Sequence, residues 1–291
     1  MAVVIANGII SAEIDPFGAQ LTRVSGNGTE YLWDGNPEIW PKHAPVLFPF
    51  VGRLVEGRYI SKGRSYDMKI HGFANNIGYE VNRISDAKAE FILRSSDETL
   101  AMYPYHFLAS VVYELSGSSI YMDMNVENTG TEEMRYGYGG HAGFNVPLEK
   151  GLGFTDYSIS LPDASGVKRV VFSPSCFPLR NVPDEDFRLD GNAIRLTHDL
   201  FDDDAVVLRN TGYRAVLSAC GGERSVEVLY EDAPFLAIWH CVGKAVPFVC
   251  IEPWWTLPGY EGEITDIDKR DDYLRLSPGE KRTHRMVYTL R

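Results

Sequence analysis

Short strand-like runs recur along the whole chain, and this recurrence limits the fold more than any other feature of the sequence. Runs of alternating or continuous apolar residues return every eight to fifteen residues, separated by clusters of Gly, Asn, Asp and Pro. Such spacing is typical of a β-sandwich or a β-barrel. Helix signals are scarce, apart from single turns such as residues 97–103. The sequence therefore predicts an all-β protein of mainly antiparallel strands.

Turn signals place two hairpins and suggest one large domain. Asn7-Gly8 separates two apolar runs near the N-terminus, and the turn at residues 116–119 joins two longer runs. The chain has 291 residues and no Pro- or Ser-rich linker, so we expect a single domain over residues 1–291. This many strands would pack as two large sheets, a large antiparallel β-sandwich with a concave face for a ligand.

The composition argues against several classes of partner. The formal net charge is −12 and no basic cluster occurs, so neither nucleic acid nor a membrane surface is expected as a partner. The N-terminus does not resemble a signal peptide, and no run approaches the length of a membrane span. Four widely spaced cysteines are expected to be reduced, buried thiols; they are Cys176, Cys220, Cys241 and Cys250. We therefore expect a cytoplasmic protein, either a monomer or a homodimer.

The segment from Phe248 to Trp255 ends a long apolar run on a single carboxylate. Residues 245–251 have the continuous apolar character of a buried strand, and Pro253 is expected to end that strand at Glu252. A carboxylate beside tryptophans at the rim of a core is partly desolvated, which raises its pKa toward the range of a general base. The segment alone leaves two interpretations about equal, a catalytic base or a structural glutamate at a strand end.

Three other segments place polar residues in apolar or glycine-rich surroundings. Arg53 follows a long hydrophobic run and a glycine, where its five donors need an acceptor. His71 follows a predicted strand and precedes a glycine. His141 stands among four glycines within residues 136–145, and glycines in a strand mark bulges or close approach by a ligand. Structural roles would explain Arg53 and His71 taken singly, whereas the surroundings of His141 favour function.

Residues 199–204 carry an acidic run, which is usually a solvated turn. It lacks the alternating acidic positions and the glycine of a calcium loop, although one member at the start of the following strand could point at a ligand. The chain has no His-Glu-x-x-His, no Gly-x-Ser-x-Gly, no phosphate-binding loop and no dinucleotide fingerprint. Neither a metal nor a cofactor is therefore predicted.

The ordered set of motifs resembles that of the aldose 1-epimerases, the galactose mutarotase family, and is closest to their LacX-like bacterial branch. The motifs are Pro45 to Arg53, His71-Gly72-Phe73-Ala74, Gly139 to Asn145, and Cys250 to Trp254. Each is weak alone, but their order and separations are specific, and the similarity covers nearly the whole chain. The resemblance implies a β-supersandwich fold, no cofactor, and interconversion of the α and β anomers of a free hexose.

The resemblance also implies roles for individual residues. Glu252 matches the general base that takes the proton of the anomeric hydroxyl, and His141 matches the general acid that protonates the ring oxygen. His71 matches a second histidine that assists by hydrogen bonding. The residues expected to bind the sugar are Arg53, Asp204 (with Asp203 fitting almost as well), Asn145, Trp239 and Trp254.

Two positions depart from the family pattern and bear on the substrate. Ala142 stands where proline is common, and Asn75 stands where the LacX-like branch often has a basic residue. A related branch acts on hexose 6-phosphates through arginine and lysine side chains, so Asn75 argues mildly against phosphate, although Lys42 or Lys69 could substitute. The alternatives are therefore a hexose-6-phosphate 1-epimerase and a non-catalytic sugar-binding protein of the same fold.

Overall fold

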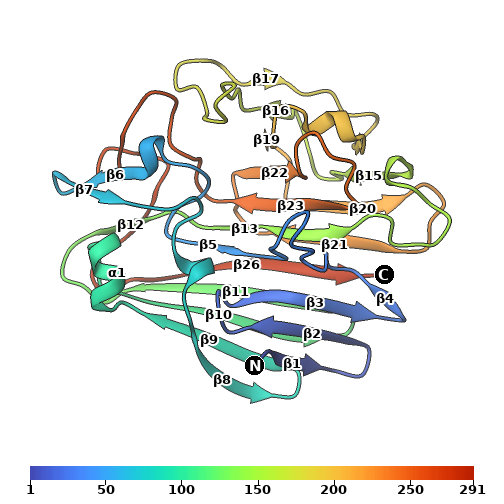
Figure 1. Ribbon diagram of the computed structural model, residues 1–291, viewed down its shortest axis with the longest axis horizontal. Coiled ribbons are helices and arrows are strands. Elements are labelled where there is room, and N and C mark those ends of the chain that lie inside the picture. Colours follow the sequence, from blue (N-terminus) through green and yellow to red (C-terminus); the bar gives the residue numbers. More distant parts are fainter.

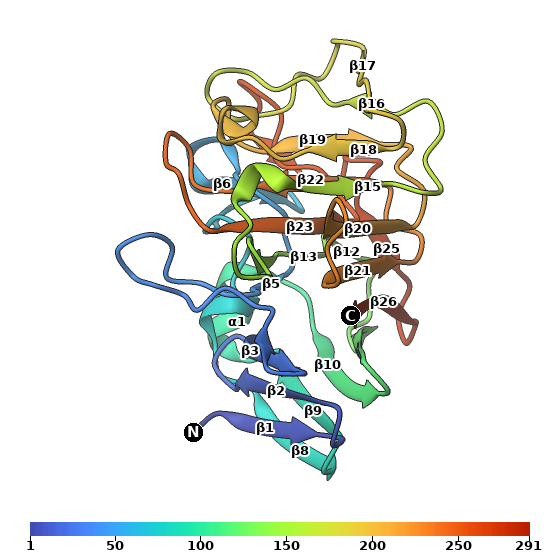
Figure 2. The same ribbon diagram turned by 90° about the vertical axis from the view of Figure 1, so that its right-hand side faces the viewer.

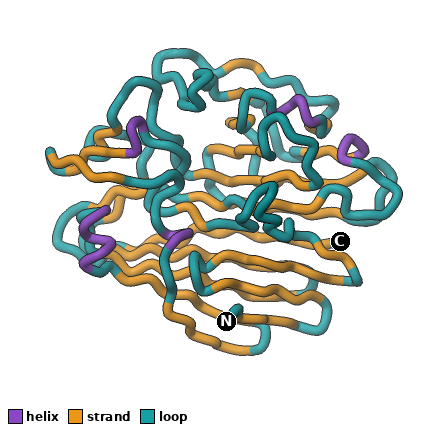
Figure 3. Tube along the Cα trace, in the orientation of Figure 1, coloured by secondary structure: helices purple, strands orange, loops and turns teal.

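The computed structural model describes residues 1–291 and shows a protein whose regular secondary structure is mostly antiparallel strand (Figures 1 and 3). The larger of its two main sheets has nine strands. In order across the sheet they are β18 (Ala193–Arg195), β15 (Tyr157–Ser160), β20 (Arg214–Ala219), β21 (Ser225–Tyr230), β26 (Lys281–Leu290), β11 (Ser119–Asn128), β10 (Phe107–Ser116), β9 (Lys88–Arg94) and β8 (Glu80–Ser85).

The second main sheet has eight strands and carries the residues discussed below. Its order is β17 (Glu185–Asp186), β16 (Lys168–Arg169), β19 (Val206–Arg209), β22 (Phe235–Trp239), β23 (Phe248–Trp254), β13 (Gly139–Gly140) and β5 (Val46–Leu47), and β14 (Ala142–Asn145) also pairs with β23. The prediction of an all-β fold with two large antiparallel sheets is confirmed.

Three small sheets and a few helical turns complete the fold. The sheets comprise β1 (Val3–Ala6), β2 (Ile10–Asp15), β3 (Gln20–Gly26) and β4 (Thr29–Glu30); β6 (Arg58–Ser61), β7 (Arg64–Asp67) and β24 (Thr265–Asp266); and β12 (Met134–Tyr136) with β25 (Leu274–Leu276). The helical segments are α1 (Asp97–Met102), η1 (Val55–Gly57), η2 (Ala74–Asn76), η3 (Phe154–Asp156) and η4 (His198–Phe201). None of these helices is long and apolar enough to cross a membrane. Both predicted hairpins form, β1 with β2 and β10 with β11.

The main core lies between the large sheets and extends under the sheet β1 to β4, which packs near β8 and β9 (Figures 1 and 2). It contains 68 buried residues, among them Val249 and Ile251 of β23. The other face of β23 contributes to two smaller apolar clusters, one with Phe248 and Cys250 and one with Trp254. A strand buried on both faces has no polar alternation, which explains its continuous apolar sequence.

The cysteines differ from the prediction in their burial. All four are free thiols, but only Cys241 and Cys250 are buried, whereas Cys220 is exposed and Cys176 is half-buried. The prediction of burial is correct for Cys241 and Cys250, which lie in apolar runs on or just after central strands of the eight-stranded sheet. Cys220 follows directly on the last residue of β20, where the chain turns into solvent.

His284 lies in the core on β26 and should make stability depend on pH. Its side chain has no exposed surface, and its Nε2 is hydrogen-bonded to Tyr136 Oη at 2.8 Å. Burial lowers the pKa of His284 to about 3, whereas an unfolded histidine titrates near 6.5. The unfolded chain therefore binds a proton that the folded chain does not, and stability falls as the pH drops from 6.5 toward 3.

We expect this one group to remove about 3 kcal/mol of folding free energy between pH 7 and pH 4. Chemical denaturation at a series of pH values measures the effect. His284→Asn lacks the titrating ring, so its stability should decline less steeply over the same range, whatever its stability at pH 7. Identical slopes for the two proteins would contradict the assignment.

Candidate active site

A cavity of about 470 Å³ opens on the face of the eight-stranded sheet that carries Glu252. Seven of the eight residues predicted to act on or bind a substrate line it: Arg53, His71, His141, Asp204, Trp239, Glu252 and Trp254. They come from β22, from β23, from the junction of β13 with β14, and from loops after β5, after β7 and before β19. The fold thus gathers residues that are widely separated in the sequence.

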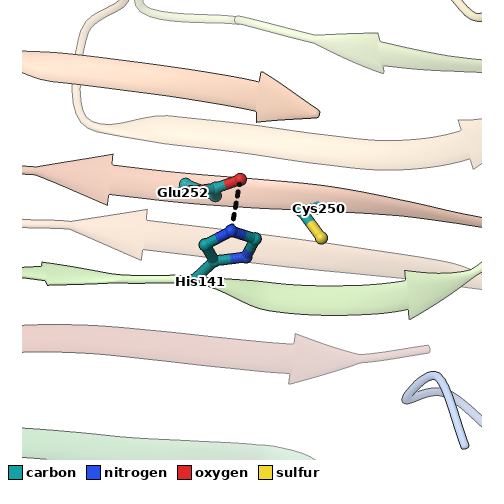
Figure 4. A group of neighbouring side chains, drawn as sticks. All are labelled: His141, Cys250 and Glu252. Atoms are coloured by element: carbon teal, nitrogen blue, oxygen red, sulfur yellow. Dashed lines mark ion pairs between the residues drawn. The ribbon is translucent and has the colours of Figure 1, made fainter. Parts of the chain in front are cut away.

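Glu252 and His141 face each other across neighbouring antiparallel strands. In the register of β23 with β14, Ala142 pairs with Ile251, so the preceding His141 lies opposite Glu252. Opposed residues on one face of a sheet bring their side chains together. His141 Nε2 lies 3.3 Å from Glu252 Oε1 (Figure 4). Only 7% of His141 and 1% of Glu252 are exposed, so the contact is almost free of solvent.

The strand that carries Glu252 continues past Pro253, so the predicted strand end at Glu252 is wrong. On one side, β22 pairs with β23 beyond the proline. On the other side, the Trp255 N–H donates to Tyr138 O at 2.8 Å. Backbone nitrogens two residues apart in a strand point to the same side, so the Pro253 nitrogen also faces the segment of Tyr138 and β13. Proline has no N–H, so a single rung of that ladder is missing, opposite Gly140. One missing rung interrupts pairing locally without ending the strand.

Burial shifts the pKa values of the pair in opposite directions, each toward the neutral form. Burial raises the pKa of Glu252 well above its usual range. The Trp254 indole donates to Glu252 Oε2 at 3.2 Å and partly offsets this rise, whereas the charge of Asp204 adds to it. Burial and the nearby His71 lower the pKa of His141. The carboxylate is therefore a stronger base, and the imidazolium a stronger acid, than either would be in water.

His71 reaches the cavity from backbone in a left-handed conformation. Its φ is 65° and that of Gly72 is 75°. The Gly52 N–H donates to His71 Nδ1 at 3.1 Å, so the neutral ring carries its hydrogen on Nε2. Burial, and then the charge of Arg53, lower the pKa of His71 to about 4. With its ring 5.3 Å from that of His141, His71 is a neutral hydrogen-bond donor beside the pair.

Asp204 joins an arginine and a tryptophan at the opposite wall. Arg53 Nη1 donates to Asp204 Oδ2 at 2.9 Å, and Trp239 Nε1 donates to Asp204 Oδ1 at 2.7 Å. Asp204 has a φ of 77°, which costs a residue other than glycine about 1–2 kcal/mol. Asp203 also lines the cavity but is exposed and makes neither contact. The geometry thus favours Asp204 over Asp203, a choice that the acidic run alone left open.

Asn145 lies outside this cavity, so the structure does not bring it together with the other residues predicted to bind the sugar. Its Nδ2 donates to the backbone carbonyls of Glu30 and Leu32, each at 2.9 Å. Asn145 lies on the same strand face as His141 but four residues further along an extended chain, roughly 13 Å away. Two residues of one sequence motif, such as His141 and Asn145, can therefore lie too far apart to share a binding site.

Trp40 is a wall residue that sequence reasoning missed. Its ring stacks on that of His141 with centroids 5.1 Å apart and on Phe248 at 5.4 Å. It lies in the long loop between β4 and β5, where no periodic pattern marks its position. Only its residue type could have suggested it, since a broad apolar ring suits the apolar face of a sugar.

Two lysines named as possible phosphate ligands also line the cavity. Lys42 Nζ donates to Asn75 O at 3.4 Å and to Asn76 Oδ1 at 3.3 Å. Burial lowers the pKa of Lys42. Lys69 is exposed on the cavity wall. The cavity therefore has basic groups besides Arg53, even though position 75 is an asparagine.

Cys250 adds a third donor atom beside the pair. It precedes Glu252 by two residues on β23 and so shares its face. One nitrogen of His141, Cys250 Sγ and one oxygen of Glu252 lie within 4.8 Å of one another (Figure 4). This cluster, at the wall of the cavity, is a place where a metal ion could be held.

Comparison with known proteins shows which family and which solved structures the chain is similar to. The family model for aldose 1-epimerase matches residues 1–289. The plasmid-encoded protein LacX of Lactococcus lactis is 30% identical over 266 residues, which span 87% of each chain. A galactose mutarotase related enzyme from Lactobacillus acidophilus is 32% identical, with a TM-score of 0.93 over 100% of this chain and 97% of that one. A galactose mutarotase-like protein from Lactobacillus casei is 31% identical, with a TM-score of 0.93 over all of both chains.

The two large antiparallel sheets and these likenesses define a galactose mutarotase-like β-sandwich. The chain belongs to the aldose 1-epimerase family, a family of isomerases. The resemblance read from the four sequence motifs is thereby confirmed.

Proposed function

We propose that the protein is an aldose 1-epimerase that interconverts the α and β anomers of a free hexose without a cofactor. The observation that carries this proposal is the 3.3 Å contact between His141 Nε2 and Glu252 Oε1 at the wall of a cavity of about 470 Å³, which has room for a monosaccharide. A base and an acid so close together can reach the two neighbouring oxygens of one sugar, the anomeric hydroxyl and the ring oxygen. Membership of the family supports the reaction class.

In the proposed reaction, two proton transfers open the sugar ring. Glu252 takes the proton of the anomeric hydroxyl while His141 gives a proton to the ring oxygen, and the bond between C1 and the ring oxygen breaks to leave an aldehyde. Rotation about the C1–C2 bond presents the other face, and the reverse transfers close the ring. Because burial favours the neutral form of both residues, it favours both opening transfers. The pair has the same total charge before and after, so no net charge is created in the buried site.

The remaining cavity residues have binding roles in this proposal. His71 Nε2–H donates near the reacting oxygens, and Arg53 with Asp204 holds sugar hydroxyls. Trp239 is half-buried whereas Trp254 is only 4% exposed, which favours Trp239 for contact with the sugar. Trp254 acts on the chemistry instead, because its indole donates to the carboxylate of the base.

Polarimetry tests the proposal directly. The rotation of freshly dissolved α-D-glucose or α-D-galactose should relax faster with the protein than in buffer alone. If no common neutral or phosphorylated hexose showed any acceleration, the proposal would be rejected. Calorimetric binding of a sugar without anomerisation would instead identify a sugar-binding protein of the same fold.

A hexose-6-phosphate 1-epimerase is a second candidate, favoured by the position of Lys42 and Lys69 on the cavity wall. It would prefer phosphorylated sugars, and raising the salt concentration would weaken their binding. Lys69→Ala should then raise KM for a hexose 6-phosphate while leaving KM for the neutral hexose unchanged. An equal effect on both sugars would argue against a phosphate site at this lysine.

Asp204→Asn is expected to raise KM about tenfold and to leave kcat nearly unchanged, because a hydrogen bond to a charged group contributes roughly 1.5–3 kcal/mol. The amide has one accepting oxygen in place of two, so it can anchor Arg53 or Trp239 but no longer both. Initial polarimetric rates over a series of sugar concentrations separate KM from kcat. Asp203→Asn is the matched control and should behave as wild type; a larger effect at Asp203 would reverse the assignment.

A further inference from the structure

Three buried side chains at the end of the cavity offer a nitrogen, a sulfur and an oxygen to a common point. His141, Cys250 and Glu252 each contribute one ligand atom, and these atoms lie within 4.8 Å of one another (Figure 4). Their exposed fractions are 7%, 0% and 1%. A second observation comes from the imidazole, whose Nδ1 is buried without a hydrogen-bond partner. Buried polar atoms are normally satisfied, so this one is free to accept a new partner.

The identity of these donor atoms selects the class of ion. Thiolate, imidazole and a single carboxylate suit Zn²⁺ and its softer relative Cd²⁺, whereas Mg²⁺ and Ca²⁺ require a shell made largely of oxygen atoms. Zinc bonds of about 2.0–2.3 Å place the ligand atoms of a tetrahedral site roughly 3.3–3.8 Å apart. Small side-chain rotations would bring the three atoms from their present separations to that geometry. The fourth position would face the cavity, which His141 and Glu252 both line.

We propose that His141, Cys250 and Glu252 form a binding site for a thiophilic divalent cation, and that its occupation inhibits the enzyme. The inhibitory part rests on the proton-transfer roles proposed above for His141 and Glu252. An ion bound through the imidazole keeps His141 from forming the imidazolium that gives up a proton, and it takes up the carboxylate oxygen of Glu252 that accepts one. It also occupies the end of the cavity where the anomeric centre of the sugar would lie, so sugar and cation should exclude each other.

Cys250 belongs to the proposed cation site but not to the pair proposed to transfer protons, so it can be used to test the two roles separately. Its thiol has no role in the proposed reaction, and it does not line the cavity itself. It packs in the small cluster with Trp33, Cys241 and Phe248. Removing the thiol should therefore weaken cation binding at least about tenfold and leave the basal reaction unchanged, an outcome that no change to His141 or Glu252 could give.

Titration of the protein with Cd²⁺ tests the site through two independent readouts. The first is the ultraviolet charge-transfer absorption of a cadmium–thiolate bond, and the second is the polarimetric rate. We expect one Cd²⁺ per chain, an absorption change that saturates together with loss of rate, reversal by a chelator, and weaker apparent binding when sugar is added. Mg²⁺ and Ca²⁺ at the same concentrations should have no effect on either readout.

Two cysteine variants locate the ion. Cys250→Ala should keep the basal rate, lose the absorption band and weaken inhibition at least about tenfold. Cys250→Val keeps more of the side-chain volume, so it should give the same three results even if alanine disturbs the packing. Cys176→Ser is the matched control, because Cys176 lines the same cavity on a separate loop, and it should respond as wild type. Persistence of the band in both Cys250 variants, or its loss in Cys176→Ser, would overturn the proposal. The absorption readout decides this even if no sugar is turned over, so failure of the proposed reaction is distinguishable from failure of the site.

Discussion

Glu252→Gln is expected to lower kcat about 1,000-fold, the range that a positioned general base contributes. Glutamine has the same shape, and its carbonyl can still accept from the Trp254 indole, but it cannot take up the anomeric proton. The wild-type carboxyl lies in a site with 1% exposure, where a charge is costly. The variant carries no such charge, so its free energy of unfolding should be equal to that of the wild type or higher. Polarimetric rates and chemical denaturation measure the two effects.

The combination of lost rate with retained stability distinguishes a catalytic base from a structural carboxylate. A structural glutamate would behave in the opposite way, losing stability first and activity only through unfolding. Glu263→Gln is a suitable control, since Glu263 forms a surface ion pair with Arg180 and should affect neither quantity. A fully active Glu252→Gln protein would show that another group accepts the proton.

The fold was predictable from strand periodicity, whereas the roles expected of Glu252 and His141 came from the family resemblance of the motifs around them. The continuous apolar run before Glu252 indicated a strand buried on both faces, and β23 is such a strand. The glycines around His141 indicated a bulge or close approach by a ligand; in the structure, the side chains of Trp254, Met286 and Trp40 pack closely against three of them. The same period of two could have placed Cys250 beside Glu252, a signal in the sequence that was overlooked.

The structure differs from the sequence-based expectations at residues whose positions depend on contacts with distant parts of the chain. Asn145 belongs to the same motif as His141, but an extended strand carries it out of reach of the cavity. Pro253 removes one donor yet leaves the strand intact, because β22 pairs on the other side. Trp40 lies in a loop without periodicity, so nothing in its neighbourhood indicates the histidine that it covers. Contacts between residues far apart in the sequence decided each of these positions, and a single sequence does not report such contacts.

Gly72→Ala is expected to cost about 4 kcal/mol of folding free energy, the sum of a left-handed conformation and a steric clash. A Cβ at this position would lie 2.2 Å from Phe48 O and 2.5 Å from Phe48 C. The Phe48 carbonyl cannot withdraw freely, because the N–H groups of Phe73 and Ala74 both donate to it at 3.1 Å. The backbone must therefore move at residue 72 itself, and the preceding His71 moves with it.

Gly63→Ala separates the two contributions to this cost. Gly63 has a φ of 71°, close to that of Gly72, but a Cβ there meets nothing within 4 Å. Conformation alone should cost about 1 kcal/mol in that control, with no loss of rate. Displacement of His71 breaks its hydrogen bond from the Gly52 N–H, which fixes the ring hydrogen on Nε2, so folded Gly72→Ala protein should also turn over more slowly. Denaturation and polarimetry on both variants give the comparison. Equal losses of stability would show that the contact with Phe48 carries no weight, because the strain of a left-handed residue would then account for the whole effect.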